Sequence, residues 1–274
     1  MRTPSKELKR RAKQKLRGKY GLCIGAQLIL YAIVSLILVM FIFAVIIAGV
    51  VGSTNLTEAQ NPVTEFLIIM LVVGILSVLM IAILSLFMPG ILKIYLNISV
   101  SQPASLSDLL YGFKNKPHKF LGLYFVLFLM MVVWSIPYYV VLAVTVITDF
   151  IPVMVVLAVL TYLLLLAGIL VTSLYVSQAL FIFTDSPDKK ILQCIRESID
   201  MMKGNKGSLF YLNISFIGMT LMGYLSMGIG YLWVVPYMYA TYAEYYQELK
   251  AQKAASSIVY DADPSFESMQ RQGF

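Results

Sequence analysis

The chain has 274 residues, of which 59% are hydrophobic and 13% are charged, and its formal net charge is +7. So few polar residues cannot cover a water-soluble domain, and the composition therefore predicts a protein with several membrane spans. Nine of the 21 Lys and Arg lie in the first 19 residues, directly before an apolar run. This placement indicates contact with anionic lipid and argues against a nucleic-acid partner.

Residues 1–20 are predicted to form a basic amphipathic helix at the cytoplasmic surface of the membrane. Leu8, Ala12 and Leu16 recur at every fourth position, the spacing of one helix face. We expect the basic residues around them to bind the anionic inner leaflet. These residues are Lys9, Arg10, Arg11, Lys13, Lys15 and Arg17.

Six apolar stretches in residues 21–248 are long enough to cross a bilayer, which takes about 20 helical residues. They are 22–51, 66–88, 120–147, 153–183, 209–225 and 229–246. The first is far longer than the apolar segment of a cleavable signal peptide, so we expect it to be an uncleaved span. The predicted fold class is an all-α membrane protein, a six-span transmembrane helical bundle with cytoplasmic interfacial amphipathic helices.

Prolines are predicted to break or kink three of these spans, because proline lacks the amide hydrogen that a helix interior needs. Pro89 is followed by Gly90 at the end of the second span, Pro137 lies within the third, and Pro236 lies within the sixth.

A short interfacial helix is predicted after the second span. Ser105 and Asp108 have the spacing of an N-cap residue and the third residue of a helix, and apolar residues follow up to Phe113.

A second interfacial helix is predicted between the fourth and fifth spans. Ser186 would be its N-cap, Pro187 would occupy its first position, and Lys203 and Gly204 would end it. Its apolar stripe comprises Ile191, Leu192, Ile195, Ile199 and Met202. We interpret this helix as a connector at the headgroup level, and the alternative is a docking helix for a partner.

The fourth span carries small or hydroxyl side chains on one face, which is typical of helix packing in lipid. They are Thr161, Gly168, Thr172 and Ala179. Gln178 and Asn213 are polar residues near the ends of spans, and together with Gln27 they are candidates for a polar cavity. The alternative interpretation is that they form hydrogen bonds between packed helices.

Every Lys and Arg falls into one of four segments, and these segments alternate with turns that have none. Nine lie in the N-terminal segment, four in residues 93–119, five in residues 189–206 and three in the C-terminal tail. The positive-inside rule therefore predicts that both termini are cytoplasmic. Residues 249–274 are predicted to be a disordered cytoplasmic tail. Cys23 and Cys194 would both lie at the cytoplasmic face of the membrane, where thiols stay reduced.

Long segments of the chain resemble a bacterial family called domain of unknown function 975. The segments are SKELKRRAKQKLRG (5–18), SLSDLLYGFKN (105–115), MMKGNKGSLFYLNISFIG (201–218) and GIGYLWVVPYMYATYAEYY (228–246). Met219 and Tyr245 stand where the family often has Trp and Phe. The resemblance implies a six-span bacterial plasma-membrane protein, and it implies no activity. The chain is also similar in arrangement to membrane domains attached to some glycerophosphodiester phosphodiesterases.

The sequence offers no catalytic, cofactor-binding or metal-binding set. His118 is a single histidine in a basic loop, and Asp185 and Asp188 stand at an expected helix start, where they complement the helix dipole. The first hypothesis is a non-enzymatic scaffold or accessory protein that binds anionic lipid, a membrane-protein partner or a second copy of itself. The alternative is a passive transporter or channel for a small uncharged or lipid-like substrate.

Overall fold

The computed structural model describes residues 4–58 and 62–262, and every secondary-structure element in these ranges is helical. The elements are α1 (Ser5–Leu16), α2 (Tyr20–Glu58), α3 (Pro62–Ser85), α4 (Phe87–Ser99), η1 (Leu106–Leu110), α5 (Tyr111–Lys114), α6 (Pro117–Ile147), α7 (Pro152–Val176), α8 (Ala179–Asp185), α9 (Ile191–Met202), α10 (Lys206–Ile214), α11 (Ile217–Leu225) and α12 (Tyr231–Ala262). The predicted all-α class is confirmed.

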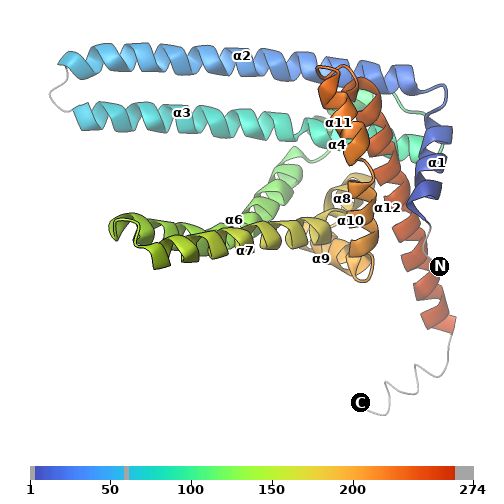
Figure 1. The fold of residues 1–274 in the computed structure, drawn as a ribbon. Helices are drawn as coiled ribbons and strands as arrows, with labels where there is room; N and C mark the ends of the chain where they lie inside the picture. Colours follow the sequence, from blue (N-terminus) through green and yellow to red (C-terminus); the bar gives the residue numbers. More distant parts are fainter. Residues whose placement is uncertain (1–3, 59–61, 263–274) are drawn as a thin grey trace.

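Two long hairpins, α2 with α3 and α6 with α7, extend in the same direction from one end of the molecule (Figure 1). Their outward side chains are apolar along most of their length: Met40 is 67% exposed, Val78 67% and Phe125 61%. Apolar surfaces of this extent are stable in lipid, where a helix satisfies its own backbone hydrogen bonds. The chain is therefore a membrane protein.

The buried core lies at the end of the molecule from which the two hairpins extend, which we call the base and define as α1, α4, η1, α5, α8, α9 and α12. Leu16, Ile94, Phe183 and Met202 are each at most 1% exposed there. The first turn of α6 reaches the same core, and the Phe120 ring packs edge-on against Phe183 with centroids 4.7 Å apart. The two apolar hairpins are thus held at one end.

The second predicted span is interrupted about one turn before Pro89, the position at which the sequence predicts a break. Helix α3 ends at Ser85 and α4 begins at Phe87, because the ring of Pro89 would clash with the carbonyl of the residue four positions earlier. Gly90 serves a different purpose. A Cβ atom on it would lie 2.1 Å from the carbonyl oxygen of Leu109, so glycine lets η1 cross closely over α4. Pro137 and Pro236 lie inside continuous helices.

The capping pattern predicted at Ser105 is confirmed. Its amide donates a hydrogen bond of 2.9 Å to the Asp108 carboxylate, and the Ser105 side chain accepts one in return. The helix that follows is short, because η1 changes to α5 and ends at Lys114.

The predicted packing face of the fourth span is found at two of its four residues. The indole nitrogen of Trp134 in α6 donates a hydrogen bond of 2.9 Å to Thr172 in α7. A Cβ atom on Gly168 would lie 2.2 Å from the same indole ring. Thr161 bonds to carbonyls of its own helix, and Ala179 is buried in α8.

Five segments of the described residues are long and apolar enough to cross a membrane. They are Tyr20–Ile47, Leu67–Ser99, Pro117–Ile147, Pro152–Asp185 and Lys206–Leu225. The predicted span 229–246 is not among them. Its residues 231–246 form the first part of α12, which runs across the ends of the two hairpins (Figure 1).

Helix α12 corrects the predicted tail. It continues to Ala262, so residues 249–262 are helical, whereas residues 263–274 lie outside the described part of the chain. The start of this segment packs in the base, since Leu249 is only 3% exposed.

The helix predicted to begin at Pro187 begins at Ile191 instead. Helix α8 reaches Asp185, and Ser186 is its C-terminal cap, so residues 186–190 form the connecting turn. The predicted end is confirmed, since Gly204 has the positive φ of +77° that suits glycine after a helix.

Candidate functional site

The apolar face of α1 packs against protein. Leu8, Ala12 and Leu16 are each at most 1% exposed and belong to the core of the base, where α1 lies along α12. The structure therefore divides the basic residues around this face into two groups, according to whether they turn toward the protein or away from it.

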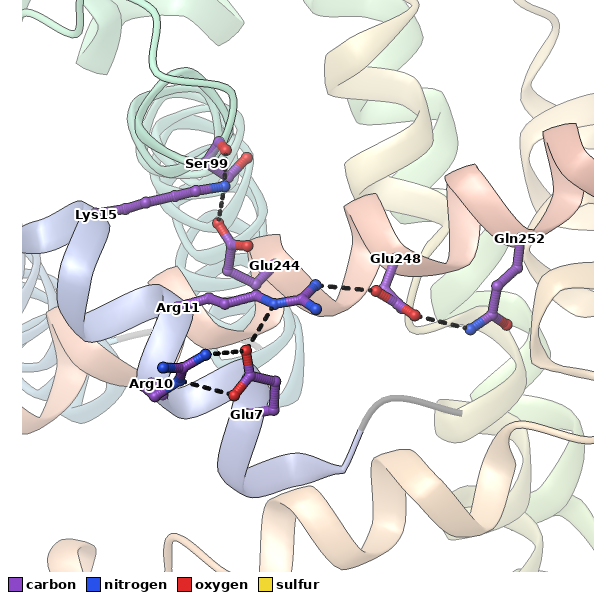
Figure 2. A network of polar contacts seen from close by, with 8 residues as sticks. All are labelled: Glu7, Arg10, Arg11, Lys15, Ser99, Glu244, Glu248 and Gln252. Atoms are coloured by element: carbon purple, nitrogen blue, oxygen red, sulfur yellow. Dashed lines mark hydrogen bonds and ion pairs between the residues drawn. The ribbon is translucent and has the colours of Figure 1, made fainter. Parts of the chain in front are cut away.

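Two residues of the first group form what we call the clasp, the ion pairs Lys15–Glu244 and Arg11–Glu248 between α1 and α12 (Figure 2). Their nitrogen–oxygen distances are 2.8 and 3.3 Å. Lys15 also donates to the carbonyl of Ser99, which is one of the last carbonyls of α4 and has no partner within its helix. The clasp thus joins the N-terminal helix to α12 and α4.

Lys9 belongs to the same group. Its ammonium donates a hydrogen bond of 2.9 Å to the carbonyl of Ser215, which ends α10, and lies 3.9 Å from the centre of the Phe216 ring. Burial lowers the pKa of Lys9. This lysine therefore connects α1 to the break between α10 and α11.

The second group faces away from the base. Lys6, Arg10, Lys13 and Arg17 fall on one face of α1 at helical spacing, and all four are exposed. Arg10 pairs with Glu7 at 2.8 Å and holds the pKa of that carboxyl below its ordinary value. In the part of the chain that the structure describes, Lys13 and Arg17 have no acidic partner.

An open groove of about 370 Å³ lies on this outer face. We call it the basic groove, and it is lined by Arg10, Lys13, Gln14, Arg17, Gly18 and Tyr20. Tyr20 is the first residue of α2. The groove therefore opens where the first apolar helix begins, and its unpaired charge is positive.

The opposite side of α12 is basic and faces α8 and α9. Lys250 lies 2.5 Å from Asp185, and Lys253 lies 3.8 Å from Glu197, which also pairs with Lys189. Helix α12 thus presents acidic residues to α1 and basic residues to the other half of the base. The sequence interpretation missed this role, although the spacing of Glu244 and Glu248 by four residues is a helix signal.

The predicted stripe of α9 is buried only in part. Ile195 is 5% exposed and Met202 is fully buried, Ile191 and Ile199 are half-buried, and Leu192 is 60% exposed. The buried face of α9 is therefore rotated about the helix axis relative to the predicted stripe, and Leu192 lies outside the buried face.

The centre of the buried face of α9 is occupied by Ser198, which the sequence interpretation missed. Its hydroxyl donates 2.7 Å to the carbonyl of Tyr175 and accepts 3.1 Å from the amide of Gln178. Those two groups flank the break between α7 and α8, so Ser198 restores the hydrogen bonds that the break leaves open. The hydroxyl is fully buried.

The three polar residues predicted to line a cavity each form a hydrogen bond with a different group. The side-chain amide of Gln178 donates to Ser177 at 3.0 Å, and Asn213 accepts a hydrogen bond of 2.8 Å from Tyr242 of α12. Gln27 donates to the Tyr31 hydroxyl at 2.6 Å and lines a small cavity of about 20 Å³, which holds no more than one water.

Both cysteines are free and buried. Burial raises the pKa of the Cys194 thiol to about 11, so the thiol stays protonated at neutral pH. Within the described ranges, no three His, Cys, Asp or Glu side chains are grouped closely enough to hold a metal ion.

No curated protein and no solved structure matches the chain. A family model described as "Protein of unknown function (DUF975)" matches residues 1–253. That range includes every described helix except the last turns of α12. The chain therefore belongs to the DUF975 family.

Proposed function

We propose that this protein is a non-enzymatic scaffold or accessory protein of the bacterial plasma membrane that binds anionic phospholipid through the basic groove. The observation that carries the proposal is the exposure of Lys13 and Arg17, without acidic partners among the described residues, beside the start of α2. Lipid headgroups lie at the level where a span begins, and basic residues next to a span bind anionic headgroups.

The clasp supports the orientation in which both termini are cytoplasmic. It joins the helix before the first candidate span to the helix after the last, which supports an arrangement with the two helices on the same side of the membrane. An even number of crossings follows, and both four and six satisfy it. All 21 basic residues lie in segments that this orientation keeps inside, and the positive-inside rule favours that arrangement.

The structure also narrows the set of residues proposed to bind lipid. Lys9, Arg11 and Lys15 bind protein groups, so replacing them would disturb the base. Arg10, Lys13 and Arg17 remain, with Lys6 on the same face. Each such residue near an anionic surface contributes about 1 kcal/mol, and the attraction falls off within a Debye length of about 8 Å at physiological salt.

The transporter hypothesis receives less support. The hydrogen bond of Asn213 to Tyr242 joins two helices and favours a role in packing over the lining of a continuous polar path, and the cavity beside Gln27 has a volume of only about 20 Å³. The hydrogen bonds of Ser198 favour a structural role for α9 over a docking role.

The test is lipid retention by the full-length protein. The protein is purified from a membrane that contains phosphatidylglycerol and phosphatidylethanolamine, and the retained lipids are measured by mass spectrometry. Lys13→Gln combined with Arg17→Gln should lower phosphatidylglycerol retention about ten-fold or more, because about 2 kcal/mol of attraction is removed.

The matched control combines Lys114→Gln with Lys190→Gln, which removes two exposed positive charges outside the groove. It should retain phosphatidylglycerol as the unchanged protein does. If the groove variant and the control lost anionic lipid equally, or if neither lost any, the groove would not be a lipid site.

A further inference from the structure

The segment Lys206–Leu225 has the length and composition of a span, but it is two short helices. Helices α10 and α11 have nine residues each, and they are separated at Ser215 and Phe216. Nine helical residues extend about 13.5 Å, against a hydrocarbon core of about 30 Å. Neither helix can cross alone, and crossing as a pair would place the break near the bilayer centre.

Lys9 argues against that placement. Its ammonium bonds to the carbonyl at this break and stacks on the Phe216 ring. If the break were at the bilayer centre, α1 would be there too, together with its six basic residues. Even one lysine at the centre costs about 2.5–3.5 kcal/mol or more. The break therefore belongs at the headgroup level, where α1 is stable.

Helix α12 lies on the same side of the membrane as the break between α10 and α11. Tyr242 and Tyr245 of α12 hydrogen bond to Asn213 and to the carbonyl of Asn205, which ties α12 to α10 and to the turn before it. Figure 1 shows α10 and α12 running across the ends of the two hairpins, whereas a further span would run alongside them.

The turn between α11 and α12 and the helix ends beside it carry highly exposed apolar side chains. Leu225 is 80% exposed, Met227 97%, Ile229 63% and Trp233 53%. Water is an unfavourable environment for such a tip, and a mixture of aliphatic and aromatic residues suits the boundary between headgroups and acyl chains. This tip is separated from the break at the headgroup level only by α11. The lipid of that same leaflet is therefore what covers the tip.

We propose that α10, α11 and the first turns of α12 form a hairpin that dips into the inner leaflet and returns without crossing. The protein then crosses the membrane four times, by α2, by α3 with α4, by α6 and by α7 with α8. The tip at Met227 anchors the base in the acyl region of the inner leaflet. Four crossings keep the even number that the clasp requires and replace the six expected from the sequence.

The test uses cysteine labelling of the full-length protein in spheroplasts and in inverted vesicles, with a membrane-impermeant maleimide. Met227→Cys is compared with Asp149→Cys in the exposed turn between α6 and α7, and with Lys203→Cys in the exposed turn between α9 and α10. The unchanged protein is the blank, because Cys23 and Cys194 are buried. Since Met227 is 97% exposed, its replacement removes no packing contact.

Asp149→Cys and Lys203→Cys should react from opposite sides. Met227→Cys should react at less than about one tenth of the Asp149→Cys level on the side that labels Asp149→Cys, and it should react fully after detergent is added. Ile229→Cys repeats the comparison at a second exposed position. If Met227→Cys reacted from the same side and to the same extent as Asp149→Cys, the hairpin would cross the membrane and the proposal would be overturned.

Discussion

The ammonium of Lys15 and the carboxylate of Glu244 lie 2.8 Å apart, and the Glu244 side chain is only 6% exposed. The pair joins residues that are far apart in the chain, one in the first helix and one in the last. Because removal of one partner would leave a buried charge unpaired, we expect breaking this contact to cost more than breaking an exposed ion pair.

Lys15→Gln should therefore destabilise the protein by roughly 2–4 kcal/mol, since it leaves the Glu244 carboxylate buried without its counter-charge. Adding Glu244→Gln in the same chain should recover much of that loss. The measurement is the thermal stability of the purified protein in detergent, and Arg10→Gln, at an exposed pair, should change stability by at most about 1 kcal/mol. A double variant no more stable than Lys15→Gln would contradict the pairing.

The second prediction concerns the part of α12 expected from the sequence to be a tail. Leu249→Asp should reduce the yield of folded, monodisperse protein, because it places a carboxylate in a site that is 3% exposed. Ala251→Asp, two residues further on at an exposed position, adds the same charge and should have little effect. Equal yields from the two variants would mean that this part of α12 is not packed.

A third comparison distinguishes the predicted stripe of α9 from the buried face. Ile195→Asp should cost several kcal/mol because Ile195 is 5% exposed, whereas Leu192→Asp should be tolerated because Leu192 is 60% exposed. Both changes replace an aliphatic residue with a carboxylate. The readout is detergent stability, with Arg196→Asp as an exposed control, and a loss of stability in Leu192→Asp would contradict the rotated face.

The fourth prediction tests the contact between α6 and α7. Gly168→Ala should destabilise this hairpin by roughly 1–3 kcal/mol, because its Cβ atom would meet the Trp134 ring at 2.2 Å. Gly74→Ala, where a Cβ atom meets nothing within 4 Å, is the matched control and should be neutral or slightly stabilising. The measurement is again the thermal stability of each variant, and equal stability would show that the indole does not cover Gly168.

Much of the architecture is encoded in local patterns. The apolar lengths of the first, third and fourth candidate spans, the capping pair Ser105 and Asp108, and the turn at Gly204 that follows α9 all agree with composition and spacing within a few residues. Each of these features depends on contacts made close by in the chain, so periodicity and capping chemistry are enough to predict it. The second candidate span begins as predicted but continues to Ser99, eleven residues beyond the predicted end.

The base could not be predicted in the same way, because it depends on contacts between residues far apart in the chain. Lys9 has the same sequence context as the other basic residues of α1, and only the fold shows its contact with Ser215. Glu248 is a polar residue just after the last predicted span, and only the fold shows its contact with Arg11. The basic residues of α1 were predicted to share one role, and the fold divides them between holding the base and facing outward.

The central claim, that α1 and α12 lie on one side of the membrane, is tested most directly by the sidedness of two cysteines. Lys6→Cys in α1 and Ala255→Cys in α12 both occupy exposed positions. With an impermeant maleimide applied to spheroplasts and to inverted vesicles, we predict that both react from the same side, opposite to Asp149→Cys. Labelling of Lys6→Cys and Ala255→Cys from opposite sides would require an odd number of crossings and would contradict the clasp and the fold of the base.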